Sequence, residues 1–136
     1  MPNRTQSLVL GFVLVAWLSL VGLFVVAQDV YLRALRLEPQ DEGRSGILAL
    51  AGITLLIGFF SLGVVRRWRW LFWLILIAFL AGSARLAVSM LELTGVLSAS
   101  MPIWYSAYQG CLGVFQVVIA LLMLRGYRRA GTWGAF

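Results

Sequence analysis

The sequence contains no histidine, only one cysteine, and just five acidic residues among 136. The lack of histidine excludes His-ligated haem, most zinc and copper sites, and general-base catalysis by an imidazole. The single cysteine, Cys111, excludes both an intramolecular disulfide and a CxxC redox pair. The chain therefore lacks most of the side chains that metal and redox chemistry require.

The chain is rich in hydrophobic residues. They make up 62% of the sequence, and only 12% of the residues are charged. A soluble domain of this length needs a more charged surface. All eleven basic residues are arginines and none is lysine, which fits a high-GC bacterial genome. We therefore expect a multi-pass protein of the bacterial cytoplasmic (inner) membrane.

The isoelectric point of about 10.8 could indicate binding to nucleic acid. The arginines, however, gather in short segments between apolar runs, as the positive-inside rule predicts for cytoplasmic loops. The segment RRWRW at 66–70 is too short for a nucleic-acid patch, and its tryptophans are typical of an anchor at a membrane interface. Nucleic acid is therefore not an expected partner.

Four apolar runs are each long enough to cross a bilayer as a helix. The first ends in a sequence that resembles a signal-peptide cleavage site, but it exceeds the typical apolar core of about 7–15 residues, so we expect a retained helix. Short connections place sequential helices side by side in opposite directions. The predicted fold is an all-α integral membrane protein, an antiparallel four-transmembrane-helix bundle forming one domain. Its spans are 8–27, 46–65, 70–91 and 103–124.

The arginines also predict the orientation in the membrane. Seven lie in the N-terminus, the turn at 66–69 and the C-terminal tail, and three lie in the acidic loop at 28–45. Both termini should therefore be cytoplasmic, with the 28–45 loop outside. The start of that loop, DVYLRALRL, is compatible with a short interfacial helix or with a solvated loop of self-compensating charge.

The third span carries a charge where a bilayer makes charge costly. Arg85 lies about 22 Å along a helix that begins near Trp70, in the outer third of an apolar core about 30 Å thick. A charged side chain there costs about 2.5–3.5 kcal/mol, so it usually has a partner and often a function. One stripe of small and polar residues contains Arg85 and should face the other helices. The stripe consists of Ala78, Ala81, Gly82, Arg85, Ser89 and Glu92.

Helix depth predicts which polar residues lie near Arg85. Gln109 on the fourth span lies about 10 Å below the outer boundary, close to the level of Arg85. Gln116 lies deeper, and we expect it to bond across to Thr54, Ser61 or a backbone carbonyl. The predicted outward-facing polar cluster consists of Gln28, Asp29, Arg44, Arg85, Glu92, Tyr105 and Gln109.

This cluster allows two interpretations. In the structural one, Arg85 pairs with Glu92 or Asp29 and holds helix ends together. In the functional one, Arg85 binds an anionic or carbonyl head group, Glu92 orients Arg85, and neighbouring side chains add hydrogen bonds. The ligand-binding candidates are Arg85, Glu92, Gln109, Tyr105, Arg44 and Asp29. We expect no catalytic residue and no metal site. The serines of the third span have no His or Lys to act as a base, and Glu92 has no second carboxylate with which to form an acid–base pair.

A family resemblance adds to this interpretation. It rests on Arg44 just before a Gly-rich second span, on the segment GSARLAVS at 82–89, on Gly95 in the loop that follows, and on a polar fourth span. Over about residues 44–124 this pattern resembles a family of small bacterial four-helix membrane proteins of unknown function, related in shape to the DoxX-like group. Some DoxX-like proteins are associated with quinone-linked redox complexes. The resemblance thus implies a quinone or a lipid as the ligand to test.

The chain also departs from that family's pattern. The last helix of the family often carries a carboxylate that can pair with the arginine, whereas here the matching region offers Gln109 or Gln116. The resemblance therefore leaves Glu92 as the substitute partner for Arg85.

We therefore expect a small non-enzymatic accessory or assembly subunit whose outward polar pocket around Arg85 binds a lipid or quinone, with no intrinsic cofactor. Its expected partners are membrane lipids and either another membrane subunit or further copies of itself. Two other functions remain open: a homo-oligomeric transporter or channel, and a quinone-linked redox subunit that needs a partner chain. A transporter requires a continuous polar path, and Leu71 to Leu80 in the inner half of the third span supplies none.

Overall fold

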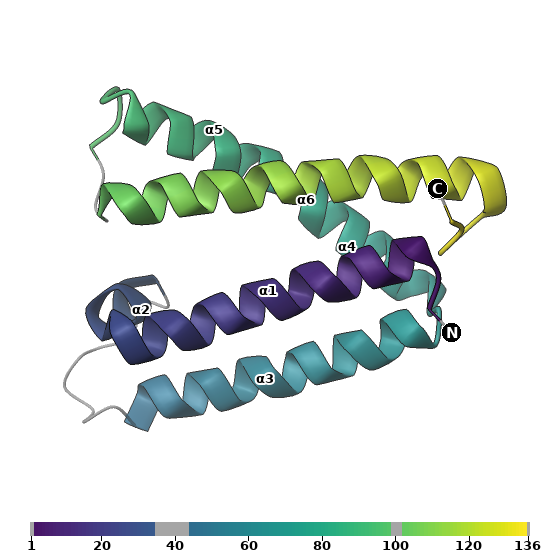
Figure 1. Ribbon diagram of the computed structural model, residues 1–136, viewed down its shortest axis with the longest axis horizontal. Helices are drawn as coiled ribbons and strands as arrows, with labels where there is room; N and C mark the ends of the chain where they lie inside the picture. The colour runs from purple at the N-terminus through teal and green to yellow at the C-terminus, as the bar shows by residue number, and fades with distance from the viewer. Residues whose placement is uncertain (1, 35–43, 99–101, 136) are drawn as a thin grey trace.

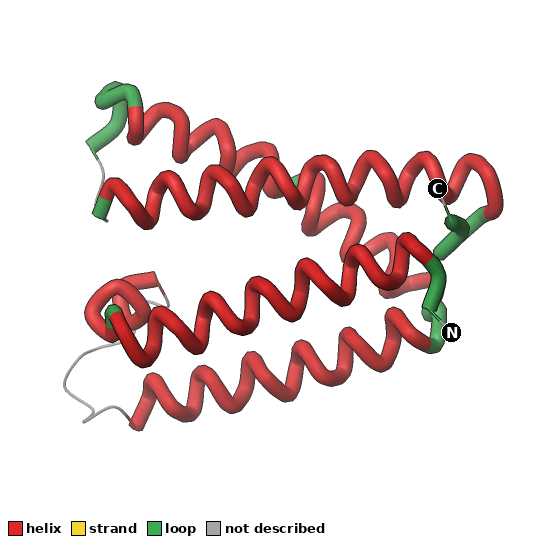
Figure 2. The backbone as a smooth tube through the Cα atoms, in the orientation of Figure 1, coloured by secondary structure: helices red, strands yellow, loops and turns green. Residues whose placement is uncertain are grey.

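The computed structural model describes residues 2–34, 44–98 and 102–135, and the regular structure in these ranges is helical (Figures 1 and 2). Four stretches are long and apolar enough to span a membrane, which confirms the predicted all-helical class: Arg4–Val26, Gly46–Val65, Arg69–Leu93 and Ile103–Ala130. The helices are α1 (Arg4–Val26), α2 (Gln28–Ala34), α3 (Arg44–Val65), α4 (Arg69–Leu80), α5 (Gly82–Leu93) and α6 (Ile103–Ala130).

The third span is not the unbroken helix that we predicted. Helix α4 ends at Leu80 and α5 begins at Gly82. Next to the break, the Ala84 amide donates to the Ala81 carbonyl at 3.1 Å, a three-residue spacing that tightens the turn. Figure 1 shows the consequence, since α4 runs obliquely through the molecule whereas α5 lies alongside α6.

Small residues explain why α5 and α6 pack so closely. A Cβ added to Gly113 of α6 would lie 3.0 Å from the carbonyl oxygen of Gly82 and 3.2 Å from the Cβ of Leu86. Gly110 faces Ser89 in the same way, at 3.4 Å from its Cβ. Small side chains let two helix backbones approach. The prediction that Gly82 and Ser89 face a neighbouring helix is confirmed, because both are buried; Ala78 and Ala81 of the same stripe are exposed.

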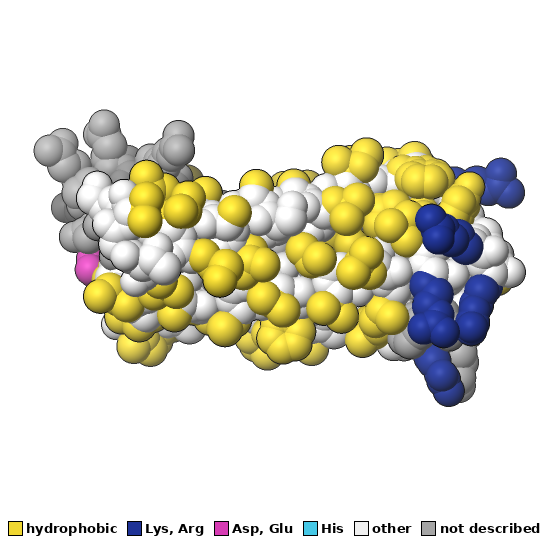
Figure 3. Space-filling model, turned by 90° about the horizontal axis from the view of Figure 1, so that it is seen from above, with side chains coloured by type: hydrophobic (Ala, Val, Ile, Leu, Met, Phe, Trp, Pro, Cys, Tyr) yellow, Lys and Arg dark blue, Asp and Glu magenta, His cyan; other side chains and the backbone are white. Residues whose placement is uncertain are grey.

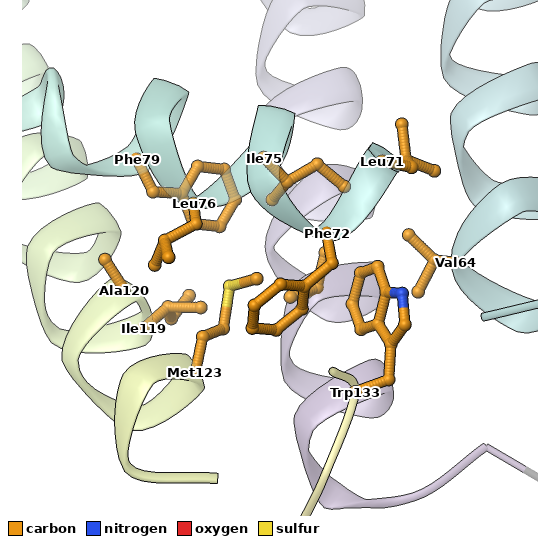
Figure 4. Close-up of a cluster of buried hydrophobic side chains, with 11 residues drawn as sticks. Val64, Leu71, Phe72, Ile75, Leu76, Phe79, Ile119, Ala120, Met123 and Trp133 are labelled. Atoms are coloured by element: carbon orange, nitrogen blue, oxygen red, sulfur yellow. The ribbon is translucent and has the colours of Figure 1, made fainter. Parts of the chain in front are cut away.

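The buried core lies at the end of the molecule where α3 leads into α4 (Figure 4). Helix α4 lies between the α1–α3 pair and the α5–α6 pair (Figure 1), and it contributes one apolar face at helical spacing. That face meets residues from α1, α3, α6 and the C-terminal tail. The core consists of Val9, Val64, Leu71, Phe72, Ile75, Leu76, Phe79, Ile119, Ala120, Met123 and Trp133.

Hydrogen bonds join both chain ends at this same end of the molecule. Asn3 caps α1 through its side-chain oxygen, which accepts from the Gln6 amide at 3.0 Å. The Asn3 side-chain amide donates to the carbonyl of Trp133 at 2.5 Å. The Gln6 side-chain amide donates to the carbonyl of Val64 at 2.6 Å. The start of α1, the end of α3 and the tail are thereby held together.

We expect Gln6→Leu to lower the free energy of unfolding by about 2 kcal/mol. Gln6 is fully buried and also accepts from the Asn3 amide at 3.0 Å, so a leucine leaves the Val64 carbonyl and that amide without partners. Unfolding in detergent micelles by an SDS titration, followed by circular dichroism, measures the change. Ser7→Ala is the control, because the Ser7 side chain is exposed. Equal midpoints for the two variants would contradict the expectation.

Helix α2 folds back on the end of α1. The short helix confirms that the DVYLRALRL segment begins as a helix, and the rest of that segment lies outside the described residues. Tyr31 is buried with its ring edge-on to Phe24, and its hydroxyl donates to the Gly46 carbonyl at 2.8 Å. Burial raises the pKa of the Tyr31 phenol, so the hydroxyl stays protonated and remains a donor.

The outside of the molecule is apolar along its length and charged at its ends. Large side chains such as Leu18, Leu55 and Phe115 are more than half exposed, as contact with hydrocarbon requires. Figure 3 shows arginines gathered at the end where the termini lie.

Candidate functional site

A pocket of about 320 Å³ lies between α5 and α6. Figure 1 shows that the end of α5 and the start of α6 lie at the end of the molecule away from the termini. Helical spacing on α5 and α6 brings the lining residues of the pocket to facing sides of the two helices. Four of the six predicted ligand-binding residues are among them. The lining consists of Ala84, Arg85, Val88, Ser89, Glu92, Tyr105, Ser106 and Gln109.

Arg85 occupies an exposed position in this pocket. One turn further along α5, Ser89 is buried against α6 and forms a closed side of the pocket. A guanidinium presents several donors in a planar fork, which suits the oxygens of a phosphate, a carboxylate or a carbonyl group. Arg85 is therefore the group in the pocket best suited to hold an oxygen-rich head group.

The structure gives Glu92 a partner that sequence reasoning missed. The Ser106 hydroxyl donates to a carboxylate oxygen of Glu92 at 2.6 Å, a short charge-assisted bond. Ser106 is buried on the same face of α6 as Gly110 and Gly113, four and seven residues before them. That spacing is the signal that could have placed Ser106 against α5.

The bond to Ser106 also separates the two charges of the pocket. Glu92 lies seven residues after Arg85, about 10 Å along α5. Its bond to Ser106 anchors it to α6 at the end of the pocket nearer the helix terminus. The pocket is therefore bipolar, with a positive charge toward the start of α5 and an anchored negative charge toward its C-terminal end.

Tyr105 and Gln109 form a second hydrogen-bonded pair in the pocket wall. The Gln109 side-chain amide donates to the Tyr105 hydroxyl oxygen at 2.9 Å. Because a phenol can accept and donate at once, the Tyr105 proton stays available to another acceptor. Tyr105 can thus donate to a ligand from the side of the pocket opposite α5.

The predicted cluster is only partly assembled. Gln28 and Asp29 are exposed on α2, which packs against α1, and neither lines the pocket between α5 and α6. Arg44 begins α3, and its side chain lies outside the described residues. Gln28 and Asp29 lie apart from the pocket because α2 packs against α1, whereas the pocket is formed by α5 and α6.

The deeper glutamine is also placed differently from our expectation. Gln116 packs beside Gly82 at the start of α5, and within the described ranges its side-chain oxygen is buried with no hydrogen-bond partner. Thr54 instead accepts from the indole nitrogen of Trp17 at 2.9 Å. The expected bond from Gln116 to Thr54, Ser61 or a backbone carbonyl is therefore not formed in the described part of the chain, because α3 packs on α1 while this face of α6 meets α5.

The described part of the chain holds no group of three His, Cys, Asp or Glu residues that could bind a metal ion. The chain matches no protein-family model, no curated protein and no solved structure. The class of protein is therefore defined by the sequence and structure of this chain itself. Its described part is helical, with four stretches long and apolar enough to span a membrane, and a pocket between the last two of these stretches has charged and polar side chains in its lining.

Proposed function

We propose that this protein is a small non-enzymatic subunit of the bacterial inner membrane whose Arg85 pocket binds the head group of a lipid or quinone. The observation that carries the proposal is the convergence of Arg85, Tyr105 and Gln109 on one pocket of about 320 Å³. This pocket lies between two stretches apolar enough to span a membrane. A charge in such a stretch is costly, and an oxygen-rich ligand offsets part of that cost.

The proposed arrangement in the membrane is an antiparallel four-helix bundle with both termini cytoplasmic. The arginines gathered at the end where the termini lie support this orientation through the positive-inside rule (Figure 3). The Arg85 pocket, at the other end of the molecule, then lies in the outer half of the bilayer.

Each pocket residue has a distinct proposed role. Arg85 binds an anionic or carbonyl oxygen of the ligand, and Tyr105, positioned by Gln109, donates a second hydrogen bond. Glu92 is held by Ser106, about 10 Å along α5 from Arg85, and forms the negative end of the pocket. The apolar side chains of the wall admit the ligand's tail.

The resemblance to the DoxX-like group supports the role as a subunit and the choice of ligand class. Its partner would be another membrane subunit or further copies of this chain, which the exposed apolar sides of the spanning helices can accommodate.

We expect the unaltered protein to keep a bound lipophile when it is extracted from the membrane in mild detergent. We expect Arg85→Ala to lose that lipophile. Charged hydrogen bonds contribute about 1.5–3 kcal/mol, so the occupancy should fall about tenfold or more. Native mass spectrometry measures the occupancy, and the accurate mass of the released molecule distinguishes a phospholipid from a quinone. Arg128→Ala, which removes an exposed arginine at the opposite end, should keep the full occupancy.

Two results count against the proposal. One is an adduct of equal occupancy in the unaltered protein and in Arg85→Ala. The other is a protein that leaves the membrane bound to another subunit and free of any lipophile, which would make Arg85 a structural clasp. Unfolding of Arg85→Ala in an SDS titration checks that a lost adduct does not reflect a lost fold.

A further inference from the structure

A second, apolar groove runs between α1 and α6, separate from the Arg85 pocket. Its first part has a volume of about 370 Å³ and is lined by α1 from Ser7 to Val15 and α6 from Tyr108 to Ile119. A hollow of about 490 Å³ continues it along α1 as far as Ala27, and Tyr108 lines both parts. Figure 1 shows that α1 and α6 diverge with distance from the termini.

The lining of the groove suits a hydrocarbon chain. It is formed mainly by apolar side chains and extends from Ser7 to Val15, about 12 Å along α1. The carbons of an acyl chain contact such side chains at about 4 Å. The groove can therefore hold an acyl chain, and the experiment below separates this occupant from a helix of a second copy.

The charges at one end of the groove select the head group. Arg4 lies on α1 one turn before Ser7, and Arg129 lies on α6 fourteen residues after Phe115, a whole number of helical heptads. Both arginines are exposed. In the described ranges the acidic residues, Asp29 on α2 and Glu92 on α5, belong to the opposite end of the molecule. Among the described side chains, a head group at the arginine end thus meets only positive charge.

We propose that the α1–α6 groove is a binding site for an anionic phospholipid. One acyl chain lies in the groove beside Gly11, and the phosphate lies between Arg4 and Arg129 in the leaflet at the arginine end. This site is distinct from the Arg85 pocket, because it lies between α1 and α6 rather than between α5 and α6, and it takes its ligand from the other end of the molecule.

Two glycines provide a matched test. An added Cβ at Gly11, in the groove, meets nothing within 4 Å, and the same holds for Gly58, which lines a notch between α1 and α3. Gly11→Phe should fill the groove without disturbing the fold, and Gly58→Phe makes the same change elsewhere. Every protein in this comparison also carries Arg85→Ala, so that a lipid in the Arg85 pocket is not counted, and the protein without a change in the groove or its arginines serves as the unaltered one. The purified proteins are mixed with equal amounts of phosphatidylglycerol and phosphatidylcholine of identical chains, and bound lipid is counted by native mass spectrometry.

We expect the unaltered protein and Gly58→Phe to retain phosphatidylglycerol about tenfold more than phosphatidylcholine, as two arginines at a membrane surface would produce. Gly11→Phe should lose the phosphatidylglycerol adduct, and Arg4→Gln combined with Arg129→Gln should remove the preference between the two lipids. Retention of phosphatidylglycerol by Gly11→Phe would overturn the proposal, and so would equal retention of both lipids by the unaltered protein. A lipid-free dimer that Gly11→Phe converts to a monomer would assign the groove to a second copy instead.

Discussion

Trp133→Ala is expected to lower the free energy of unfolding by about 3–5 kcal/mol, the range for removing a large aromatic side chain from a core. Trp133 is only 1% exposed, and its ring meets Phe72 edge-on at 5.3 Å between centroids. Its indole nitrogen donates to the carbonyl of Trp68 at 3.0 Å. The substitution therefore leaves a cavity among α1, α3, α4 and α6 and also removes a hydrogen bond at the turn between α3 and α4.

An SDS titration in detergent micelles measures this loss as a shift of the unfolding midpoint. Trp70→Ala is the matched control, since Trp70 is 52% exposed and its loss should cost less than about 1 kcal/mol. A similar shift for the two variants would show that the tail does not stabilise the core. A large shift for Trp133→Ala alone would establish the last residues of the chain as part of the folded unit.

Gly113→Leu should have the second largest effect, a loss of about 3 kcal/mol, at the upper end of the usual cost of overpacking. The new side chain would meet the carbonyl oxygen of Gly82 and the Cβ of Leu86 at the α5–α6 contact. A backbone oxygen cannot rotate away as a flexible side chain can, so α5 must shift from α6. Because the Arg85 pocket lies between these two helices, the bound lipophile should be lost as well.

Stability in micelles and native mass spectrometry together test this expectation. Gly52→Leu serves as the control, because an added Cβ at Gly52 on α3 meets nothing within 4 Å. If Gly113→Leu unfolds at the same midpoint as Gly52→Leu and keeps its adduct, then the close approach of α5 and α6 is not what shapes the pocket.

The contrast between the two ends of the molecule relates packing to the proposed binding sites. At the end with the termini, the core and the bonds of Asn3 and Gln6 hold α1, α3, α4 and the tail together. Toward the other end α1 and α6 separate, and the hollow lined by Tyr108 and Trp104 opens between them. The molecule thus combines one closely packed end with grooves between helices that side chains leave unfilled.

Most of the candidate pocket could be predicted from helical periodicity. Arg85 and Glu92 share a face of α5 at a spacing of seven residues, and Tyr105 and Gln109 share a face of α6 at a spacing of four residues. To predict that they meet, it was enough to know which two helices face each other. The spacing of Ser106 from Gly110 and Gly113 places it on their face of α6, but its bond to Glu92 was missed because that bond depends on the rotation of α6 about its axis. The same rotation turns Gln116 toward Gly82 and away from α3.

The break in the third span was not predicted because no proline marks it. Leu80, Ala81 and Gly82 are compatible with a continuous helix, and glycine within an apolar span is common. The structure favours a break because the two halves pack differently. The bulky face of α4, with Phe72 and Phe79, fills the core, whereas the small residues of α5 lie against α6.

The sequence by itself determined the four apolar stretches, the concentration of arginines in a few short segments, and the small-residue face of α5. These properties depend on residues near one another in the chain, because the cost of placing each side chain in hydrocarbon adds up along a helix. The tertiary structure alone decided the bend at Ala81, the bond between Glu92 and Ser106, the burial of Trp133 and the groove between α1 and α6. Each of these depends on how helices rotate and cross, and that geometry results from many small contacts between distant parts of the chain.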